Sequence, residues 1–498
     1  MRPFLLLFIL LLATWSTALH AQDPRVGREA ALAMDFEELD FDPPRARSLT
    51  LSTGPRVIFL EDHALPLVTV YARFRGGYSL LPRRYYAAAT ALPGLLRAGG
   101  TSTLSPDSVD FLLDYYALQT TFGGGGEGNF SSLNTLTKHL DPALDLWGDM
   151  LKNPAFDARE LEVWRGRQEE NIRRRGDDPG RLAFSEFNHI MFGDHPVGWE
   201  MNREDLSPER LNRETTEEVH GRIFCPGNLV LGVVGDVTWA EMRPLLEDLT
   251  RDWEPCGEPL DPLPIPEMRR KRKIFLIPRD ISQSTVVLAE PGGVRQGSDP
   301  DYFASRIGNS ILGAGGFTSR LVTRVRTEEG YAYSASSLWT TPASYEGIVG
   351  AVTRTKSGST VAAIELILET MEEMRRAPPR QDEVDRTVAQ IVNGFVFNFQ
   401  DPSQIVARQM FYLSQDLPDD WLVRYLEGIQ RVTPERVRQV FRRHLHPDRM
   451  TILVVGNPDA FDRPLETLGE VEVWEVEGMG AVSEPDPGSP RGGRRYPR

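Results

Sequence analysis

Hydrophobic and polar positions along the chain predict two similar halves. Each half opens on an alternating segment that ends in two glycines, VTVYARFRGG at 68–77 and STVVLAEPGG at 284–293. A period of two is typical of a strand with one buried face. Each half also contains an apolar strand followed by Gly and a polar cap, at 226–242 and 447–461. Glycine at that point indicates a turn in which the backbone comes close or takes positive φ.

Matching turns between these strands support a duplication. RRRGDDPGRL at 173–182 and FNFQDPSQIV at 397–406 each interrupt a long polar helical pattern. The strands and turns recur in the same order and at similar spacing in the two halves. This repetition predicts a duplicated α+β domain, and we assign the first domain to 48–253 and the second to 274–465.

The segments outside the two domains have distinct compositions. Prolines recur through 254–273, and because proline lacks an N–H and has a fixed φ, this segment is predicted to be a semi-rigid linker. Residues 466–498 are predicted to be a tail, with a disordered end rich in Gly, Pro and Arg. Residues 1–21 have an arginine, an apolar run and small residues, as in a cleaved signal peptide. An uncleaved anchor helix is the alternative.

Export, charge and cysteine content limit the classes of function. No later segment reaches the ~20 apolar residues that a membrane span requires, so we expect an exported, periplasmic protein with no membrane span after signal cleavage. The net charge of −15 argues against nucleic-acid binding, which needs a basic face. Cys225 and Cys256 are the two cysteines. They form a disulfide or remain buried thiols, and the sequence leaves both alternatives open.

One segment carries a specific resemblance. LGAGGFTSRLVTRVRTEEGYAYSAS, at 312–336, combines a Gly-rich turn, Ser-Arg-Leu, an arginine and a Gly-x-Ala-Tyr-Ser strand. Together with LKNPAF, FGDHPVGW and NLVLGVVGDV upstream, it resembles the pitrilysin/insulinase family of zinc peptidases over 49–465. The resemblance implies an α+β fold of two duplicated domains, each a mainly antiparallel sheet with helices on one face. Such a pair is one half of a clamshell, and another chain or domain pair supplies the other half.

The zinc motif of that family is degenerate here. Active members carry H-x-x-E-H on the helix before a Gly-Thr pair, so that two imidazoles on one helical face hold zinc beside a glutamate base. Here the helix is the alanine-rich segment 85–98, followed by Gly100-Thr101 and a second helix opened by Ser105. With Gly100-Thr101 as the anchor, the motif positions are Ala91, Gly94 and Leu95; with 95–96 as the anchor, they are Thr90, Pro93 and Gly94.

The remaining zinc ligand is also missing. The resemblance places it at Asn171, where active members have a glutamate. None of the eight histidines has another histidine four residues away. His444 and His446 are a relocated metal site or ordinary surface histidines, and the second reading is the default. His195, in FGDHPVGW, is interpreted as structural. We therefore expect no cofactor in this chain and zinc in a partner subunit.

Other site residues of the family are retained. The resemblance implies that Arg326 and Tyr333 complete an active site in trans, since a guanidinium can grip a substrate carbonyl or carboxylate and a phenol can stabilise an oxyanion. Arg324 departs from the family pattern, in which an acidic residue is common. The Gly-rich segment 120–133 matches a substrate-binding edge strand, although four consecutive glycines also suit a loop. The implied substrate-binding residues are Gly126, Gly128, Asn129 and Phe130.

The sequence thus favours a non-catalytic subunit of an exported, two-chain zinc metallopeptidase. A homologous zinc-bearing subunit with H-x-x-E-H is the expected partner in a heterodimer, and a peptide is the expected substrate. The alternative is an inactive peptide-binding or scaffold protein of the same fold. A self-sufficient peptidase with an unrecognised site is disfavoured, because neither register of the zinc motif supplies a ligand or a base.

Overall fold

The computed structural model describes residues 45–476 except 270 and 298. The predicted signal peptide and the end of the predicted tail lie outside the described residues. Within the described chain, both halves belong to one compact unit. Among these residues, no helix combines the length and the apolar character required to cross a bilayer.

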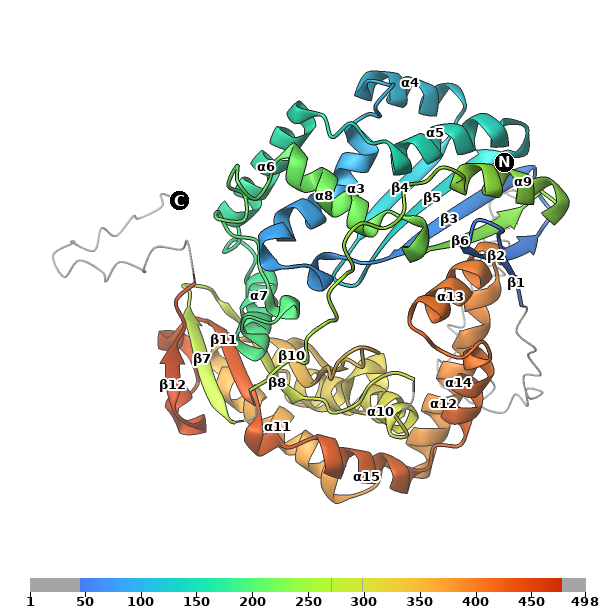
Figure 1. Cartoon of the computed structure of the whole chain (residues 1–498). Helices are drawn as coiled ribbons and strands as arrows, with labels where there is room; N and C mark the ends of the chain where they lie inside the picture. Colours follow the sequence, from blue (N-terminus) through green and yellow to red (C-terminus); the bar gives the residue numbers. More distant parts are fainter. Residues whose placement is uncertain (1–44, 270, 298, 477–498) are drawn as a thin grey trace, which may run out of the picture. The chain divides into compact units, whose positions relative to one another are not determined.

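The first half forms a six-stranded sheet in the order β1-β2-β6-β3-β5-β4 (Figure 1). Its strands are β1 (Arg47–Thr50), β2 (Arg56–Glu61), β3 (Leu67–Arg75), β4 (Gln119–Gly124), β5 (Gly128–Leu136) and β6 (Leu229–Gly235). All neighbours are antiparallel except β2 and β6. The alternating pattern that predicts β3 is confirmed, because Val68, Val70 and Phe74 are fully buried.

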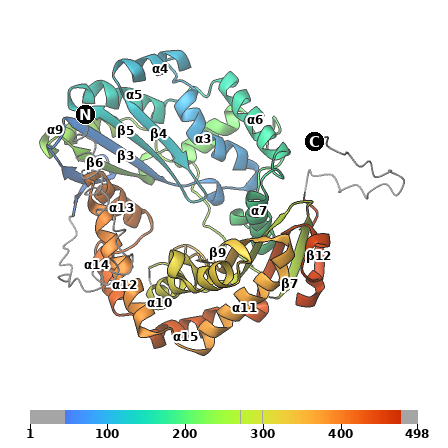
Figure 2. The ribbon, with the colours of Figure 1, turned by 180° about the vertical axis from the view of Figure 1, so that it is seen from behind.

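Helices of the same half cover one face of this sheet (Figures 1 and 2). They are α3 (Tyr86–Ala98), α4 (Pro106–Tyr115), α5 (Leu140–Lys152), α6 (Ala158–Arg173), α8 (Arg213–Ile223) and α9 (Trp239–Thr250). Their apolar sides enclose one hydrophobic core with the sheet, in which Phe59, Phe74 and Trp147 are buried.

The second half repeats the arrangement in the order β12-β7-β11-β8-β10-β9. Its strands are β7 (Lys273–Pro278), β8 (Gln283–Pro291), β9 (Ala332–Trp339), β10 (Ile348–Lys356), β11 (Thr451–Gly456) and β12 (Val471–Val473). Its helices are α10 (Tyr302–Asn309), α11 (Thr360–Arg376), α12 (Gln381–Phe395), α14 (Trp421–Gln430) and α15 (Pro434–His444). The predicted α+β class with two related sheets is confirmed. Strand β12 carries the packed chain beyond residue 465, where we placed the second domain boundary.

Two helices are exchanged between the halves. Helix α7 (Pro179–Phe192) packs against β8 and β11 of the second sheet, while α13 (Pro402–Ser414) packs against β6, β2 and β3 of the first. Figures 1 and 2 show α7 beside the second sheet and α13 beside the first. The matching turns found in the sequence open these two helices, because Asp178 and Asp401 cap their first N–H groups just before a proline.

The exchanged helices lie on the sheet faces opposite to the resident helices. Ile58 and Val234 contact Val406 and Met410 of α13, whereas the neighbouring residue Phe59 faces the core of the first half. Successive side chains of a strand point to opposite faces. The resemblance implied helices on one face only, so the exchanged helices are an addition that the sequence patterns did not predict.

The linker is bonded to residues of the first half at two points. Cys225 and Cys256 form a disulfide, with Cα atoms 5.0 Å apart, which decides between the alternatives left open by the sequence. His195 is buried, and its Nε2 lies 2.8 Å from the carbonyl oxygen of Pro264. Its Nδ1 accepts a hydrogen bond from the N–H of Val197, so Nε2 carries the proton that Pro264 accepts. His195 therefore holds the linker.

Candidate functional site

The degenerate zinc motif is packed against its surroundings. Ala91 and Leu95 on α3 are 0% and 1% exposed, and both belong to the core of the first half. A β-carbon added at Gly94 would lie 3.6 Å from the Trp164 ring of α6. Asn171, further along α6, is exposed and donates to Gln168. In this register, no motif position carries a group that can bind zinc.

The alternative register of the zinc motif, at Thr90, Pro93 and Gly94, also supplies no zinc ligand. Thr90 donates its hydroxyl to the backbone carbonyl of Tyr86, one turn earlier. Pro93 lies inside α3, where it removes one helical N–H donor. In the part of the chain that the structure describes, no cluster of three or more His, Cys, Asp or Glu side chains is arranged to hold a metal ion. The donor set at these positions therefore does not fit a bound zinc ion.

His444 and His446 are each bound to a buried carboxylate. His444 Nε2 lies 2.7 Å from Asp301, which also pairs with Arg443 and Arg436. Burial opposes ionisation of Asp301, but these partners keep its pKa below the ordinary value. His446 Nδ1 lies 3.3 Å from Glu290. Burial raises the pKa of Glu290 to about 8 and lowers that of His446.

The Gly-rich segment contains the edge strand β4, which pairs with β5 on one side. Its glycines make room for the side chains of β5. A β-carbon at Gly123 would lie 2.3 Å from the Phe130 ring, and one at Gly124 would lie 2.0 Å from Asn129 Oδ1. Among the described residues, no strand pairs with the other side of β4.

The four implied substrate-binding residues lie at the β4–β5 turn and the start of β5. Phe130 is 46% exposed, whereas Asn129 is buried and donates to the carbonyl of Gly76. The Gly126 carbonyl accepts from Ser79 N–H, and the Gly128 carbonyl accepts from Gly125 N–H. The hydrogen-bonding capacity that remains for an extended peptide is therefore on the outer side of β4.

Arg326 and Tyr333 are brought together on the surface of the second half. Arg326 lies in a π-helical turn, Val322–Glu328, and its Cζ is 5.6 Å from the Tyr333 ring centroid. The Phe317 ring lies 5.0 Å from the same Cζ. Tyr333 is 78% exposed and Phe317 is 77% exposed. These three side chains, Phe317, Arg326 and Tyr333, form an aromatic–guanidinium cluster, of which Phe317 was not singled out from the sequence.

A β-bulge directs Tyr333 outward. Ser334 pairs with Arg354 and Ala332 pairs with Thr355, so Tyr333 is the extra residue between two paired positions of β9. Bulges re-aim a side chain, and together with π-turns they are frequent next to functional sites. Arg324 points elsewhere, because it bonds Glu373 and Thr370 of α11. Its charge is thereby balanced within the chain.

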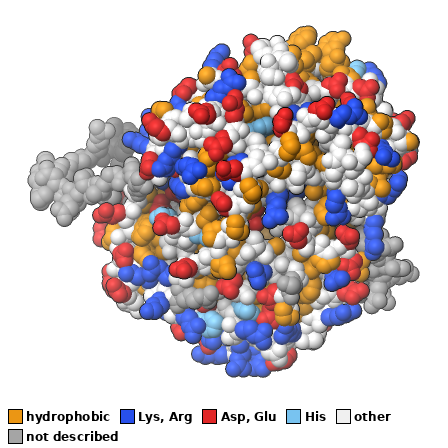
Figure 3. Space-filling view, in the orientation of Figure 1, with side chains coloured by type: hydrophobic (Ala, Val, Ile, Leu, Met, Phe, Trp, Pro, Cys, Tyr) orange, Lys and Arg blue, Asp and Glu red, His pale blue; other side chains and the backbone are white. Residues whose placement is uncertain are grey.

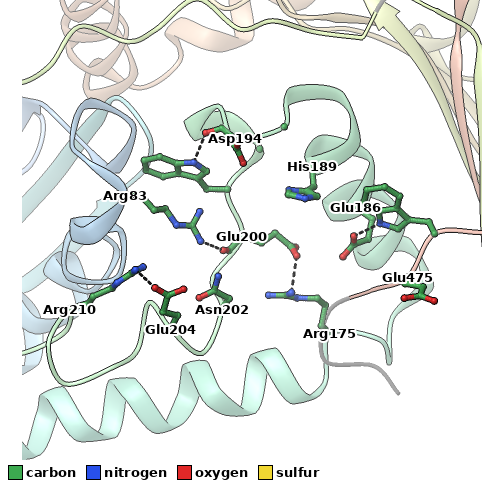
Figure 4. Close-up of a pocket in the computed structure, with 14 residues that line it drawn as sticks. Arg83, Arg175, Glu186, His189, Asp194, Glu200, Asn202, Glu204, Arg210 and Glu475 are labelled. Atoms are coloured by element: carbon green, nitrogen blue, oxygen red, sulfur yellow. Dashed lines mark hydrogen bonds and ion pairs between the residues drawn. The ribbon is translucent and has the colours of Figure 1, made fainter. Parts of the chain in front are cut away.

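A separate pocket of about 510 Å³ is lined by charged side chains (Figure 4). Arg175 faces Glu200 at 3.0 Å, and Arg210 pairs with Glu204. Arg83 bonds the carbonyl of Glu200 and the carboxylate of Asp205. Among the described residues of the wall, each arginine already bonds an oxygen of the chain, and this network holds the 193–210 segment in place.

The chain is similar in sequence to known peptidase homologues. A family model described as the peptidase M16 inactive domain matches residues 210–391. An uncharacterized zinc protease of Streptomyces coelicolor is 27% identical over 316 residues, which are 62% of this chain and 67% of that protein. The non-peptidase homolog YmxG of Helicobacter pylori is 21% identical over 401 residues, which are 80% and 91% of the two chains.

A solved structure shows the same fold. The crystal structure of a peptidase M16 inactive domain from Pseudomonas fluorescens has a TM-score of 0.77 and 23% identity, and it covers 85% of this chain and 100% of that one. The duplicated sheets and the matched segment define a peptidase-like domain pair. The chain is a homologue of the inactive domain of M16 peptidases, the pitrilysin family. The family prediction is thus confirmed.

Proposed function

We propose that this chain is the non-catalytic subunit of an exported, two-chain zinc peptidase. The observation that carries the proposal is the exposed Arg326–Tyr333 pair on a bulge, combined with an α3 that has no ligand. A tyrosine of an alternating strand is ordinarily half-buried, but Tyr333 is 78% exposed. Among the described residues, no ion pair or hydrogen bond engages the Arg326 guanidinium, which contacts only two rings.

The chemistry of the pair suits a substrate held by a partner. The planar guanidinium of Arg326 binds a peptide carbonyl or carboxylate through its forked donors. The Tyr333 hydroxyl donates to the oxygen on which negative charge develops when water attacks the scissile carbonyl. Zinc and the general base then come from a homologous subunit with an intact H-x-x-E-H motif. In this division of roles, this chain orients the substrate and stabilises the oxyanion.

The location of the complex is part of the proposal. The N-terminal residues have the pattern of a signal peptide. A disulfide between Cys225 and Cys256 suits an oxidising compartment such as the periplasm. Both features support export, and with it a heterodimer assembled outside the cytoplasm.

A second candidate is a peptide-binding or scaffold protein without catalysis. The outer side of β4, with which no described strand pairs, favours it, because an extended peptide can add to such an edge by backbone hydrogen bonds. The similarity to the Helicobacter pylori non-peptidase homolog YmxG also supports it. A scaffold makes no use of the Tyr333 hydroxyl, so the two candidates are distinguishable.

The test is a tagged chain purified from its own host. We expect a copurifying subunit with H-x-x-E-H, zinc in the complex and chelator-sensitive hydrolysis of a fluorogenic peptide. Tyr333→Phe keeps the ring and removes the donor, so it should lower kcat by roughly 100-fold, the effect of losing one oxyanion donor. Arg326→Lys keeps the charge, loses the fork and should raise KM.

Tyr331→Phe is the matched control, two residues earlier and outside the cluster. It should leave turnover unchanged, and size-exclusion chromatography should show intact assembly for all variants. Wild-type turnover from a complex that contains Tyr333→Phe would favour the scaffold.

A further inference from the structure

A cleft of about 500 Å³ in the second half has no role in the function proposed above. It lies among α10, α12, α13 and α14, beside the π-helical turn Ser310–Ala314. We call it the α10–α14 cleft. Its volume is in the range of pockets that bind small molecules or single side chains.

Aromatic rings form much of its wall. The Tyr302 ring centroid is 5.9 Å from that of Trp421 and 6.4 Å from that of Tyr425. The Phe395 ring stacks on Tyr425 at 5.7 Å. Tyr302 and Trp421 are 5% and 3% exposed, so packing fixes both rings. A rigid aromatic wall suits a flat apolar group, because ring pairs gain energy beyond simple burial.

The charge of the wall is positive. Arg306 and Arg408 line the cleft, and none of the described residues that line it is Asp or Glu. Arg408 donates to Asn398 Oδ1 at 2.8 Å and to Tyr412 Oη at 3.4 Å, and its Nε is buried without an acceptor. Arg306 is exposed and makes no ion pair with a described residue.

The first half offers an internal comparison. Tyr86 begins α3 as Tyr302 begins α10, and its ring lies 5.6 Å from Trp199. The corresponding pocket, of about 280 Å³, also contains Arg175 and Glu200, which pair at 3.0 Å. The duplicated position is therefore smaller in the first half, where Arg175 is paired with Glu200, and larger and without a carboxylate among its described lining residues in the second.

We propose that the α10–α14 cleft binds a carboxylate joined to an aromatic group. Such a ligand is the C-terminal residue of a peptide that ends in Phe, or a free aromatic acid. The ring packs against Tyr302 and Trp421, and the carboxylate meets Arg306 at the rim and Arg408 deeper in the wall. Charge-assisted hydrogen bonds from arginine to a carboxylate are stronger than neutral ones, so the amide of the same ligand binds more weakly.

The test is calorimetric titration of the full chain with four probes. Two are the peptide Ala-Ala-Ala-Phe with a free carboxylate and the same peptide amidated at its C-terminus. The others are N-acetyl-phenylalanine and its amide. We expect each acid to bind at least about tenfold more tightly than its amide, as for the loss of one charged hydrogen bond. Tighter binding of the peptide acid identifies a peptide C-terminus, and equal binding of the two acids identifies a site for small aromatic acids.

Two variants locate the binding site. Arg306→Gln should weaken both acids about tenfold and leave the amides unchanged. Gly394→Leu, on α12, adds a side chain that starts in open space at the wall of the cleft and should abolish binding. Gly166→Leu is the matched control, because Gly166 is an open helical glycine of α6 in the first half.

Equal affinity for acids and amides overturns the proposal, and so does wild-type binding by a folded Gly394→Leu protein. Thermal unfolding checks the fold of each variant. If Gly394→Leu does not fold, the exposed Arg306→Gln variant still decides the outcome. No part of the test uses a partner subunit or peptide cleavage. Failure here therefore leaves the proposed subunit function untouched, and failure of that function leaves this result unaffected.

Discussion

At the residue scale, burial separates tyrosines that a pattern cannot distinguish. Tyr302 is buried, and desolvation raises its pKa to about 12. Tyr86, its counterpart at the start of α3, is also buried and has a raised pKa for the same reason. Tyr333 lies in an alternating strand but is the extra residue of a bulge, with its ring in solvent. Of these three tyrosines, Tyr333 alone can offer its hydroxyl to an external substrate without a change in the core.

A buried histidine makes stability depend on pH. His220 Nε2 lies 2.8 Å from the carbonyl oxygen of Leu151, and its ring stacks on Phe224. Burial lowers its pKa to about 4, from 6.5. Below pH 6.5, His220 is therefore protonated in the unfolded chain but stays neutral in the folded chain until the pH approaches 4. Stability is complete above pH 6.5 and falls as the pH drops toward 4, by about 1.4 kcal/mol per pH unit.

The measurement is denaturant unfolding at pH 7 and pH 5. The wild-type free energy of unfolding should include a loss of about 2 kcal/mol from His220 between these values. His220→Gln keeps a donor for Leu151 but cannot titrate, so its pH 7 to pH 5 difference should be smaller by that amount. An identical pH difference in both proteins would show that His220 is not the responsible group.

At the element scale, the disulfide fixes the start of the linker to the first half. Cys225 follows α8 and Cys256 lies 31 residues later. Two hydrogen bonds support the same attachment, from Gly257 N–H to the Gly221 carbonyl and from Arg222 to the Pro259 carbonyl. The bond closes a loop that the unfolded chain would otherwise leave free.

Removal of the disulfide should destabilise the protein. For a loop of 31 residues, the chain-entropy relation gives about 3–4 kcal/mol. The Cys225→Ala, Cys256→Ala double variant should unfold at lower denaturant than the wild type. Dithiothreitol should lower the wild-type midpoint and leave that of the variant unchanged. A wild-type midpoint that does not respond to full reduction would contradict the assigned role of the bond.

The sequence predicted elements better than it predicted their neighbours. β3 was visible as an alternating segment, and the caps Asp178 and Asp401 were visible as matching turns. β8 was visible as a strand, but the prediction of one buried face is wrong for it, because residues 284–291 are all buried. The sequence did not show against which sheet α7 and α13 pack. Periodicity indicates that a helix has an apolar face, but it does not indicate which sheet covers that face. The bulge at Tyr333 depends on pairing with β10, and the sequence of β9 alone does not contain that information. The α10–α14 cleft lies among four helices, so the local pattern of any one helix could not predict it.

At the scale of the whole molecule, the exchanged helices couple the two halves. Buried faces of α7 contribute to the core of the second sheet, and those of α13 to the outer face of the first. Each half therefore lacks part of its packing when the other is absent. The surface seen in Figure 3 interleaves acidic and basic side chains, so on that face the charges form no large field of one sign.

The coupling can be measured at one contact between the halves. A β-carbon at Gly232, in β6, would lie 2.2 Å from Met410 Sδ and 2.7 Å from Val406 Cγ1 of α13. Gly232→Ala should therefore cost about 1–3 kcal/mol by overpacking, and it should speed proteolysis within 402–414 as α13 loosens.

Gly166→Ala, at an open helical position, is the control and should be neutral or stabilising by up to about 1 kcal/mol. Met410→Ala removes the nearest obstacle, so the double variant Gly232→Ala, Met410→Ala should lose less stability than the sum of its single changes. Strict additivity in that cycle, measured by denaturant unfolding, would mean that α13 does not dock on β6 in solution.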